Sequence, residues 1–321
     1  MDETNPIEKP RLGLSTCLLG ENVRYDGGHK LNRFIRDELG RFVDFVPVCP
    51  EVECGLPIPR ESMRLEGDPD NPRLMTARSR KDITPRMLEW AKGRLDELEP
   101  KDLSGFIFKS KSPSSGLMRV KVYGKNNIPR KIGVGIFARA FTERFPLLPA
   151  EEDGRLNDPV IRENFIERIF AYQRWRTLLA GRRTRGALVE FHTRHKYFLL
   201  AHSPKHTREM GKLLAAARDH TTPDLYAGYQ DLFLAALALH TTVRKNTNVL
   251  QHMAGYFKRV LSADERAELK EIIERYHAGH VPLIVPVTII NHFVRKYEEP
   301  YLGRQWYLNP HPIELQLRNH P

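Results

Sequence analysis

Cysteine is scarce in this sequence and unevenly distributed. Only three cysteines occur in 321 residues, and Cys17, Cys49 and Cys54 all lie within the first 54. Three thiols are too few for a framework of several disulfides, and no fourth cysteine is present to complete a zinc site made of cysteines alone. His29 is the only histidine before residue 190. The remaining interpretations are a three-thiolate site with one open position or three small buried apolar side chains.

Long apolar runs are also missing. No run approaches the ~20 residues that a membrane-spanning helix needs. The segment Met1–Pro6 lacks the basic and apolar regions of a signal peptide. We therefore expect a cytoplasmic protein with no membrane partner, in which the thiols stay reduced and available to a metal.

Charge differs between the two halves of the chain. Residues 156–321 contain 24 Lys and Arg against 16 Asp and Glu, whereas residues 1–155 contain 27 against 24. This basic excess permits an anionic partner such as nucleic acid. No arginine-rich arm or known nucleic-acid motif is present, so a solvated basic surface is the simpler interpretation.

The first 150 residues alternate short β-rich runs with helical stretches. This βαβ alternation predicts a Rossmann-like α/β domain with a parallel sheet. The predicted strands are Arg11–Thr16, Phe42–Val48, Gly105–Phe108 and Met118–Tyr123, and the predicted helices are Leu31–Gly40, Thr84–Leu98 and Ile132–Arg144.

A segment rich in proline and acid, Phe145–Arg155, separates this region from the rest. Beyond it, apolar residues recur at i, i+3 and i+4, which is typical of amphipathic helices. We therefore predict an α/β domain over 1–150 and an all-α domain over 151–321. The predicted helices are Ile161–Leu179, Arg185–Leu200, Thr207–Asp219, Pro223–Leu239, Thr241–Arg259, Ala263–Ala278 and Pro286–Tyr297.

The three cysteines follow predicted strands, where open α/β sheets bind ligands. Cys49 and Cys54 flank two carboxylates in a loop stiffened by proline, and four residues separate them, as in plant-type ferredoxins. The loop 109–116 follows another strand, and its lysines, hydroxyls and amides suit an anion or a polar substrate. These features predict a site at the carboxyl end of the sheet.

A second group of polar residues lies in the helical region. His192 and His195 are three residues apart and share a helix face, and His195 and His202, two turns apart, share one too. The spacing resembles that of metal ligands, but no companion carboxylate is present as in H-E-x-x-H. Interhelical hydrogen bonding is the simpler interpretation, with an anion or nucleic-acid site as the alternative.

Two sets of motifs follow one another along the chain. The first set is Ser15–Gly20, Val23–His29, Val48–Val52, Gly55–Arg60 and Lys111–Gly116. The second set is Phe191–Lys196, Ala201–Pro204, Asn248–His252, Gly255–Lys258, Pro282–Pro286 and Asn309–Pro312. By the first set, residues 11–150 resemble the thiouracil desulfidase family, and by the second, residues 155–321 resemble the YbgA-type helical domain that is often fused to it.

The resemblance implies a 4Fe-4S cluster held by three cysteines. A free iron of that cluster binds the sulfur of a small thiolated pyrimidine such as 2-thiouracil, and water replaces this sulfur without a redox change. By motif, Cys17 and Cys49 are ligands, while Glu51 and Ser112 move protons or position water.

One position departs from the family pattern. The third expected cysteine ligand falls at Ser115, where the family usually reads Ser-Pro-Ser-Cys-Gly. Two alternatives follow. Either Cys54 takes over the ligand role, which preserves three thiolates, or Ser115 ligates weakly and the cluster is labile or absent.

Overall fold

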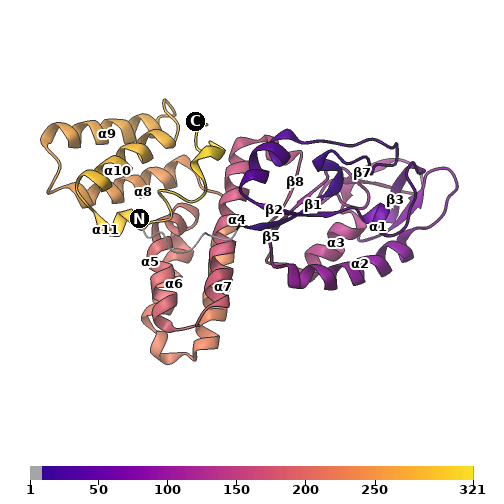
Figure 1. Ribbon diagram of the computed structural model, residues 1–321, viewed down its shortest axis with the longest axis horizontal. Coiled ribbons are helices and arrows are strands. Elements are labelled where there is room, and N and C mark those ends of the chain that lie inside the picture. The colour runs from indigo at the N-terminus through magenta and orange to yellow at the C-terminus, as the bar shows by residue number, and fades with distance from the viewer. Residues whose placement is uncertain (1–8, 321) are drawn as a thin grey trace. The chain divides into compact units, whose positions relative to one another are not determined.

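The computed structural model describes residues 9–320 and divides into two compact units. The first ends at Asp158 and the second begins at Pro159 (Figure 1). The first is an α/β unit and the second is all-helical in its described residues, which confirms the predicted fold class.

A parallel four-stranded sheet forms the centre of the first unit. Its strand order is β2-β1-β5-β8, and every neighbouring pair is parallel. The strands are β1 (Arg11–Ser15), β2 (Asp44–Val48), β5 (Leu103–Phe108) and β8 (Ala150–Glu152). Every residue of β5 is buried, as expected for a central strand of a covered parallel sheet.

Two helices bury their apolar faces beside this sheet. Helix α2 spans Thr84–Leu98, as predicted, with Pro85 in its first turn and four buried residues at helical spacing: Met87, Ala91, Leu95 and Leu98. Helix α3 spans Ile136–Arg144. Its Phe141 packs against Phe106 of β5, with the ring centroids 4.6 Å apart.

A second, mixed sheet was not predicted. Its order is β4-β3-β6-β7, in which β3 (Met63–Asp68) and β4 (Asn71–Thr76) form an antiparallel hairpin. Strand β6 (Val120–Tyr123) pairs in parallel with β3, and β7 (Pro129–Gly133) pairs antiparallel with β6. Pairing of distant segments, such as Leu65 with Val122, stabilises this sheet, and a local sequence pattern does not report such pairing.

Two predicted helices differ from the structure. Residues 31–40 form a π-helical turn at Phe34–Glu38 and a 3₁₀ turn at Leu39–Arg41 instead of a regular α-helix. Only Ile35 and Leu39 of these turns are buried, so little apolar surface supports a longer helix. The helix predicted from Ile132 begins at Ile136 because Gly135 is extended, and β7 occupies the residues up to Gly133.

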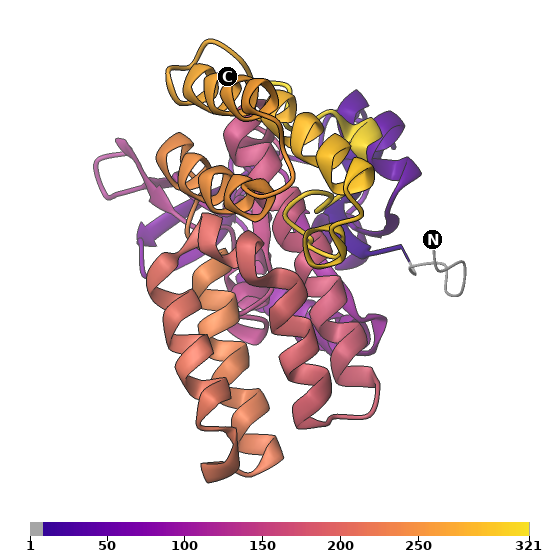
Figure 2. The ribbon, with the colours of Figure 1, turned by 90° about the vertical axis from the view of Figure 1, so that its left-hand side faces the viewer.

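The second unit is a helical bundle (Figures 1 and 2). Helices α5, α6 and α7 run side by side as rods in both views. The helices are α4 (Pro159–Ala180), α5 (Arg185–His202), α6 (Pro204–Ala215), α7 (Thr222–Leu237), α8 (Val243–Ala254), α9 (Ala263–His277), α10 (Ile284–Lys296) and the short α11 (Pro300–Gly303).

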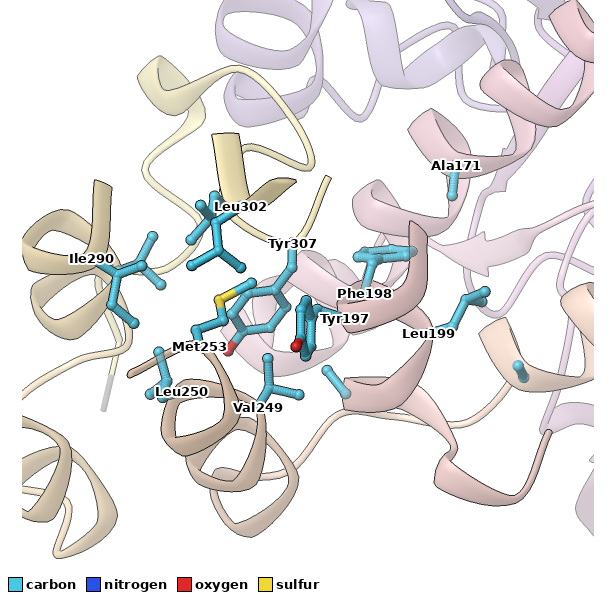
Figure 3. Packing of buried hydrophobic residues seen from close by; sticks show 14 of the residues in the cluster. Ala171, Tyr197, Phe198, Leu199, Val249, Leu250, Met253, Ile290, Leu302 and Tyr307 are labelled. Atoms are coloured by element: carbon cyan, nitrogen blue, oxygen red, sulfur yellow. The ribbon is translucent and has the colours of Figure 1, made fainter. Parts of the chain in front are cut away.

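Side chains from several helices form one core in this unit (Figure 3). Tyr307 of the C-terminal segment lies beside Met253 of α8 in this view, and its ring is fully buried. Its hydroxyl donates a hydrogen bond to Asn246 Oδ1 over 3.2 Å. The C-terminal segment therefore contributes to the core of this unit. Among residues 9–320, no helix is both long and apolar enough to cross a membrane.

Candidate active site at the strand ends of the parallel sheet

Three adjacent strands carry the predicted site residues to one edge of the parallel sheet. Cys17 lies in the 3₁₀ turn Thr16–Leu19 that follows β1. Cys49 follows β2 and caps the one-turn helix α1 (Pro50–Glu53). The loop 109–116 follows β5. Since β2, β1 and β5 are neighbours and parallel, the carboxyl ends of all three meet at the same edge.

A cavity of 640 Å³ opens at this edge, and we call it the strand-end cavity. Its volume lies in the range of small-molecule sites. Five cationic side chains and one carboxylate of the described residues line it. The lining residues are Ser15, Thr16, Cys17, Val23, Arg24, Tyr25, Lys30, Val48, Cys49, Pro50, Glu51, Arg60, Ser62, Met63, Lys109, Ser110, Lys111, Ser112, Pro113 and Ser115.

Cys17 and Cys49 both lie on the cavity wall as free, largely buried thiols. Burial, and then the Glu51 carboxylate, raise the pKa of Cys17 from 9.0 to about 11. The same two causes raise the pKa of Cys49 to about 12. The Cys49 Sγ lies 3.7 Å from Glu51 Oε2 and can donate to it. Without a bound metal, both side chains are therefore neutral thiols at pH 7.

Cys54 lies elsewhere, and this corrects the prediction that it shares the site. Its side chain packs in an apolar cluster with Leu65, Met87, Val120 and other buried residues, and it does not line the strand-end cavity. Its Sγ donates to the backbone oxygen of Glu51 over 3.3 Å. Five residues after Cys49, the chain has passed through α1 and directs this thiol into the core.

Ser115 takes a place on the cavity wall. It is 3% exposed, and its backbone N–H donates to Ser112 Oγ over 3.2 Å. The Ser115 and Ser114 hydroxyls lie 3.3 Å apart. The cavity wall thus carries two thiols, and the buried hydroxyl residues on it are Ser15, Thr16 and Ser115.

Glu51 and Ser112 are brought together through Ser114, a residue that sequence reasoning did not single out. The fully buried Ser114 hydroxyl donates a short hydrogen bond to Glu51 Oε1 and lies 2.9 Å from Ser112 Oγ. A hydrogen-bonded chain of Glu51, Ser114 and Ser112 results. Ser114 belongs to the loop motif Lys111–Gly116. Its partner Glu51 lies 63 residues earlier in the chain, so no local sequence pattern indicates this contact.

Arg60 is the second residue that sequence reasoning missed. Its Nη2 lies 4.0 Å from Glu51 Oε2, and its side chain is 7% exposed. Its Nη1 donates to the backbone oxygen of Val23 over 3.0 Å, while the buried Nε has no hydrogen-bond partner within residues 9–320. Arg60 therefore holds a positive charge beside the carboxylate of the cavity.

Comparison with known proteins finds similar families for both parts of the chain. A family model described as 2-thiouracil desulfurase matches residues 12–153, and one described as a protein of unknown function (DUF1722) matches residues 196–312. The uncharacterized protein YbgA of Escherichia coli strain K12 is 33% identical over 153 residues, which cover 47% of this chain and 90% of that protein.

The chain belongs to the YbgA family and carries a thiouracil desulfidase domain at its N-terminus. A solved structure of the 4Fe-4S-dependent thiouracil desulfidase TudS is 28% identical, covers 47% of this chain and 95% of that chain, and has a TM-score of 0.38. The resemblance inferred from the motifs is thereby confirmed for both domains.

The donor set of the desulfidase domain does not fit a cluster held by three thiolates. Of the three cysteines, only Cys17 and Cys49 reach the strand-end cavity, and the third position on its wall is the Ser115 hydroxyl. Within residues 9–320, no three His, Cys, Asp or Glu side chains gather to hold a metal ion. Cys54 cannot supply the third thiolate without leaving its apolar cluster.

The histidines of the YbgA-type domain have structural partners. His192 Nδ1 lies 3.1 Å from the Tyr229 hydroxyl, and His195 Nδ1 lies 2.8 Å from the backbone oxygen of Phe191. His202 Nδ1 lies 2.7 Å from the backbone oxygen of Leu239. Burial lowers the pKa of His192 to about 4 and that of His195 well below its usual value. The His195 Nδ1 contact lies within α5, but its Nε2 accepts from Arg174 Nε of α4 over 3.2 Å. His192 joins α5 to α7, so hydrogen bonds between helices agree with the simpler interpretation.

Proposed function

We propose that the strand-end cavity removes sulfur from a small thiolated nucleobase such as 2-thiouracil and releases it as sulfide. The observation that carries this proposal is the gathering of Cys17, Cys49, Glu51 and Ser112 around one cavity of the domain that matches the 2-thiouracil desulfurase family. In the proposed reaction, water adds its oxygen to the thiocarbonyl carbon and the carbon–sulfur bond breaks. Both protons of the water leave with the sulfur as hydrogen sulfide, so no oxidant or reductant is needed.

Glu51 is the proposed proton acceptor. Among the described residues it is the only carboxylate that lines the cavity, and Ser114 and Arg60 hold it on two sides. Ser112 lies one hydroxyl further along the same hydrogen-bonded chain and is the proposed group that positions the water. General-base catalysis requires such a positioned acceptor within hydrogen-bond reach of the proton.

The cofactor proposed from the resemblance is a 4Fe-4S cluster, with Cys17 and Cys49 as its firm ligands. Retention of the cluster depends on a third ligand from the cavity wall. At the position where the family usually has this cysteine, the cavity carries Ser115.

The test measures uracil by chromatography and sulfide by a colorimetric assay. Protein as isolated and protein reconstituted anaerobically with iron and sulfide are each incubated with 2-thiouracil. We expect equal amounts of uracil and sulfide, and a decrease in kcat of about 10²–10⁴-fold for Glu51→Gln.

The control Glu61→Gln alters a carboxylate that accepts from Ser79 and does not line the cavity, so it should leave kcat unchanged. Sulfide without uracil, or full activity of Glu51→Gln, would contradict the proposed mechanism.

A second candidate function concerns the YbgA-type domain. The turn between α4 and α5 exposes Arg182, Arg183 and Arg185. Arg183 and Arg185 donate to the backbone oxygens of Leu179 and His220, which leaves their charges available to an anion. This turn favours binding of nucleic acid through its phosphates.

Fluorescence anisotropy of a labelled RNA or DNA oligonucleotide tests this second function with the full chain. Affinity should fall steeply as salt rises, and the Arg182→Ala, Arg183→Ala, Arg185→Ala triple variant should show a weaker salt dependence. No binding at low salt would rule out this role for the turn.

A further inference from the structure

This chain departs from the family pattern at Ser115, the position where the third cysteine ligand is expected. Two thiols, Cys17 and Cys49, lie on the cavity wall after β1 and β2. The loop after β5 completes the wall with Ser115. The segments at the ends of three adjacent parallel strands therefore place Cys17, Cys49 and Ser115 on the wall of the same cavity.

Ser115 is held rigidly in this position. The Ser114 carbonyl accepts from the backbone N–H groups of Phe137 and Ala138, over 2.9 and 3.2 Å. Gly116 N donates to Ser112 O over 2.8 Å, and Gly135 N donates to Gly116 O over 2.7 Å. The loop is thus tied to the start of α3 on both sides of Ser115.

Cys54 is held just as firmly outside the cavity. Its backbone N–H donates to Pro50 O over 3.1 Å, and its carbonyl oxygen accepts from Arg86 Nε over 2.5 Å. It is 7% exposed and packs with buried side chains of β3, β4, β6 and α2. Moving the thiol to the cavity would break this packing and open a void in the core.

We propose that Ser115, and not Cys54, is the third donor of a metal–sulfur site with Cys17 and Cys49, and that this hydroxyl makes the site hold iron weakly. A serine oxygen is a harder ligand than a thiolate and suits iron–sulfur sites less well. The choice of cofactor rests on the proposed desulfurase function, whereas the assignment of the donor rests on the geometry of this chain.

The experiment is anaerobic reconstitution of the full chain with ferrous iron and sulfide, followed by desalting. Iron, acid-labile sulfide and the visible absorbance are measured, and iron loss to a chelator is followed over time. The variants are Ser115→Cys, Ser115→Ala, Cys17→Ala and Cys54→Val. The last keeps an apolar side chain of similar volume in the core, and near-UV circular dichroism checks that it is folded.

We expect Ser115→Cys to retain several-fold more iron than the parent protein and to approach about four irons per chain. Ser115→Ala should lose iron faster than the parent. Cys54→Val should match the parent in iron content and in the rate of iron loss, while Cys17→Ala should lose its iron. Loss of iron by Cys54→Val to the same extent as by Cys17→Ala would overturn the proposal. So would a Ser115→Cys variant that holds no more iron than the parent.

Iron content does not depend on turnover. The iron measurement can therefore contradict the donor assignment, and the activity assay the proposed function, independently of each other. A Ser115→Cys protein loaded with iron but unable to form uracil would refute the proposed function and leave the donor assignment standing. Loss of all iron by Cys54→Val, together with uracil formation by the parent protein, would refute the donor assignment and leave the proposed function standing.

Discussion

At the scale of the residue, the hydrogen bond from Ser114 to Glu51 defines the geometry of the candidate base. Ser114 is fully buried and contacts Glu51, Ser112 and Ser115 through its hydroxyl. A buried hydroxyl with three polar neighbours is held in one orientation, and it holds the carboxylate in turn. Ser114 is therefore a positioning residue for Glu51.

The substitution Ser114→Ala tests this role. Removing a hydrogen bond to a charged group costs about 1.5–3 kcal/mol, and we expect kcat for 2-thiouracil to fall about tenfold or more. KM should change little because Ser114 does not line the cavity. The matched control is Ser79→Ala, since the Ser79 hydroxyl also donates to a glutamate, Glu61, over 2.7 Å but outside the cavity. A rise in KM without a change in kcat would contradict the positioning role.

The reactivity of the thiols is a second prediction at this scale. Burial and the Glu51 carboxylate raise the pKa of Cys17 to about 11 and that of Cys49 to about 12. Only the thiolate is alkylated, so both residues of the metal-free protein should react slowly with iodoacetamide at pH 8. Their rates should increase as pH rises toward these pKa values.

Glu51→Gln removes the carboxylate charge, which is one of the two main causes of the raised pKa values of Cys17 and Cys49. It should therefore accelerate the alkylation of both thiols. Mass spectrometry of peptides at timed intervals measures each site separately. Glu61→Gln is the control because Glu61 is not among the groups that shift the pKa of either thiol. Equal rates in the parent and in Glu51→Gln would show that the carboxylate does not influence the thiols.

At the scale of the element, the loop after β5 depends on the absence of a side chain at Gly135. A Cβ at this position would lie 2.5 Å from the backbone carbon and oxygen of Ser114 and 2.8 Å from the nitrogen of Gly116. These are backbone atoms, which cannot move aside as a flexible side chain can. The close approach of α3 to the loop is what places Ser114 and Ser115.

Gly135→Ala should therefore displace the loop and lower both stability and activity. Overpacking of this kind costs about 1–3 kcal/mol. Thermal and urea denaturation measure the loss, and the uracil assay reports the site. Gly93→Ala in α2 is the control, because no heavy atom of the described residues beyond its chain neighbours and its own helix backbone lies within 4 Å of the added Cβ, and alanine favours a helix interior. It should maintain or raise stability; an equal loss in both variants would refute the steric argument.

Helix existence was largely predictable at this scale, whereas the second sheet was not. Helix α2 has its predicted bounds because the proline in its first turn and the apolar repeat both act locally. Strand β3 pairs with β6, which lies much further along the chain, and β4 joins the sheet through its hairpin with β3. Local periodicity does not contain that information.

At the scale of the whole molecule, each unit has its own core, and in the second the C-terminal segment returns to its first helix. Arg318 is 5% exposed and bonds to Glu163 Oε1 over 3.2 Å and to Glu167 Oε1 over 2.7 Å. Burial alone would raise the pKa of Glu167, but Arg318 together with His202 and His311 outweighs it and lowers the pKa to about 2. The Arg318 guanidinium thus makes both contacts, with partners that lie 155 and 151 residues earlier in the chain.

Arg318→Leu leaves two buried carboxylates without this cation and should lower the free energy of unfolding by about 3–5 kcal/mol at pH 7. The folded pKa of Glu167 lies below its usual 4.5, so its contribution is present above pH 4.5 and disappears as pH falls toward 2. The deficit of the variant should therefore shrink below pH 4.5.

Urea denaturation at pH 7 and pH 4 measures this difference. Arg295→Leu removes an exposed arginine of α10 and should have little effect at either pH. A deficit of Arg318→Leu that is the same at both pH values would show that Arg318 acts through packing and not through its charge.

The sequence by itself determined both family memberships, the helices of the second unit and the placement of Cys17 and Cys49 at strand ends. These features rest on local motifs and on periods of two or 3.6 residues, which one segment carries alone. Only the tertiary structure decided that Cys54 faces the core, that Ser115 faces the cavity and that Ser114 holds Glu51. The direction of a side chain beside a one-turn helix depends on what packs against it, and here β3, β4, β6 and α2 supply that packing from distant parts of the chain.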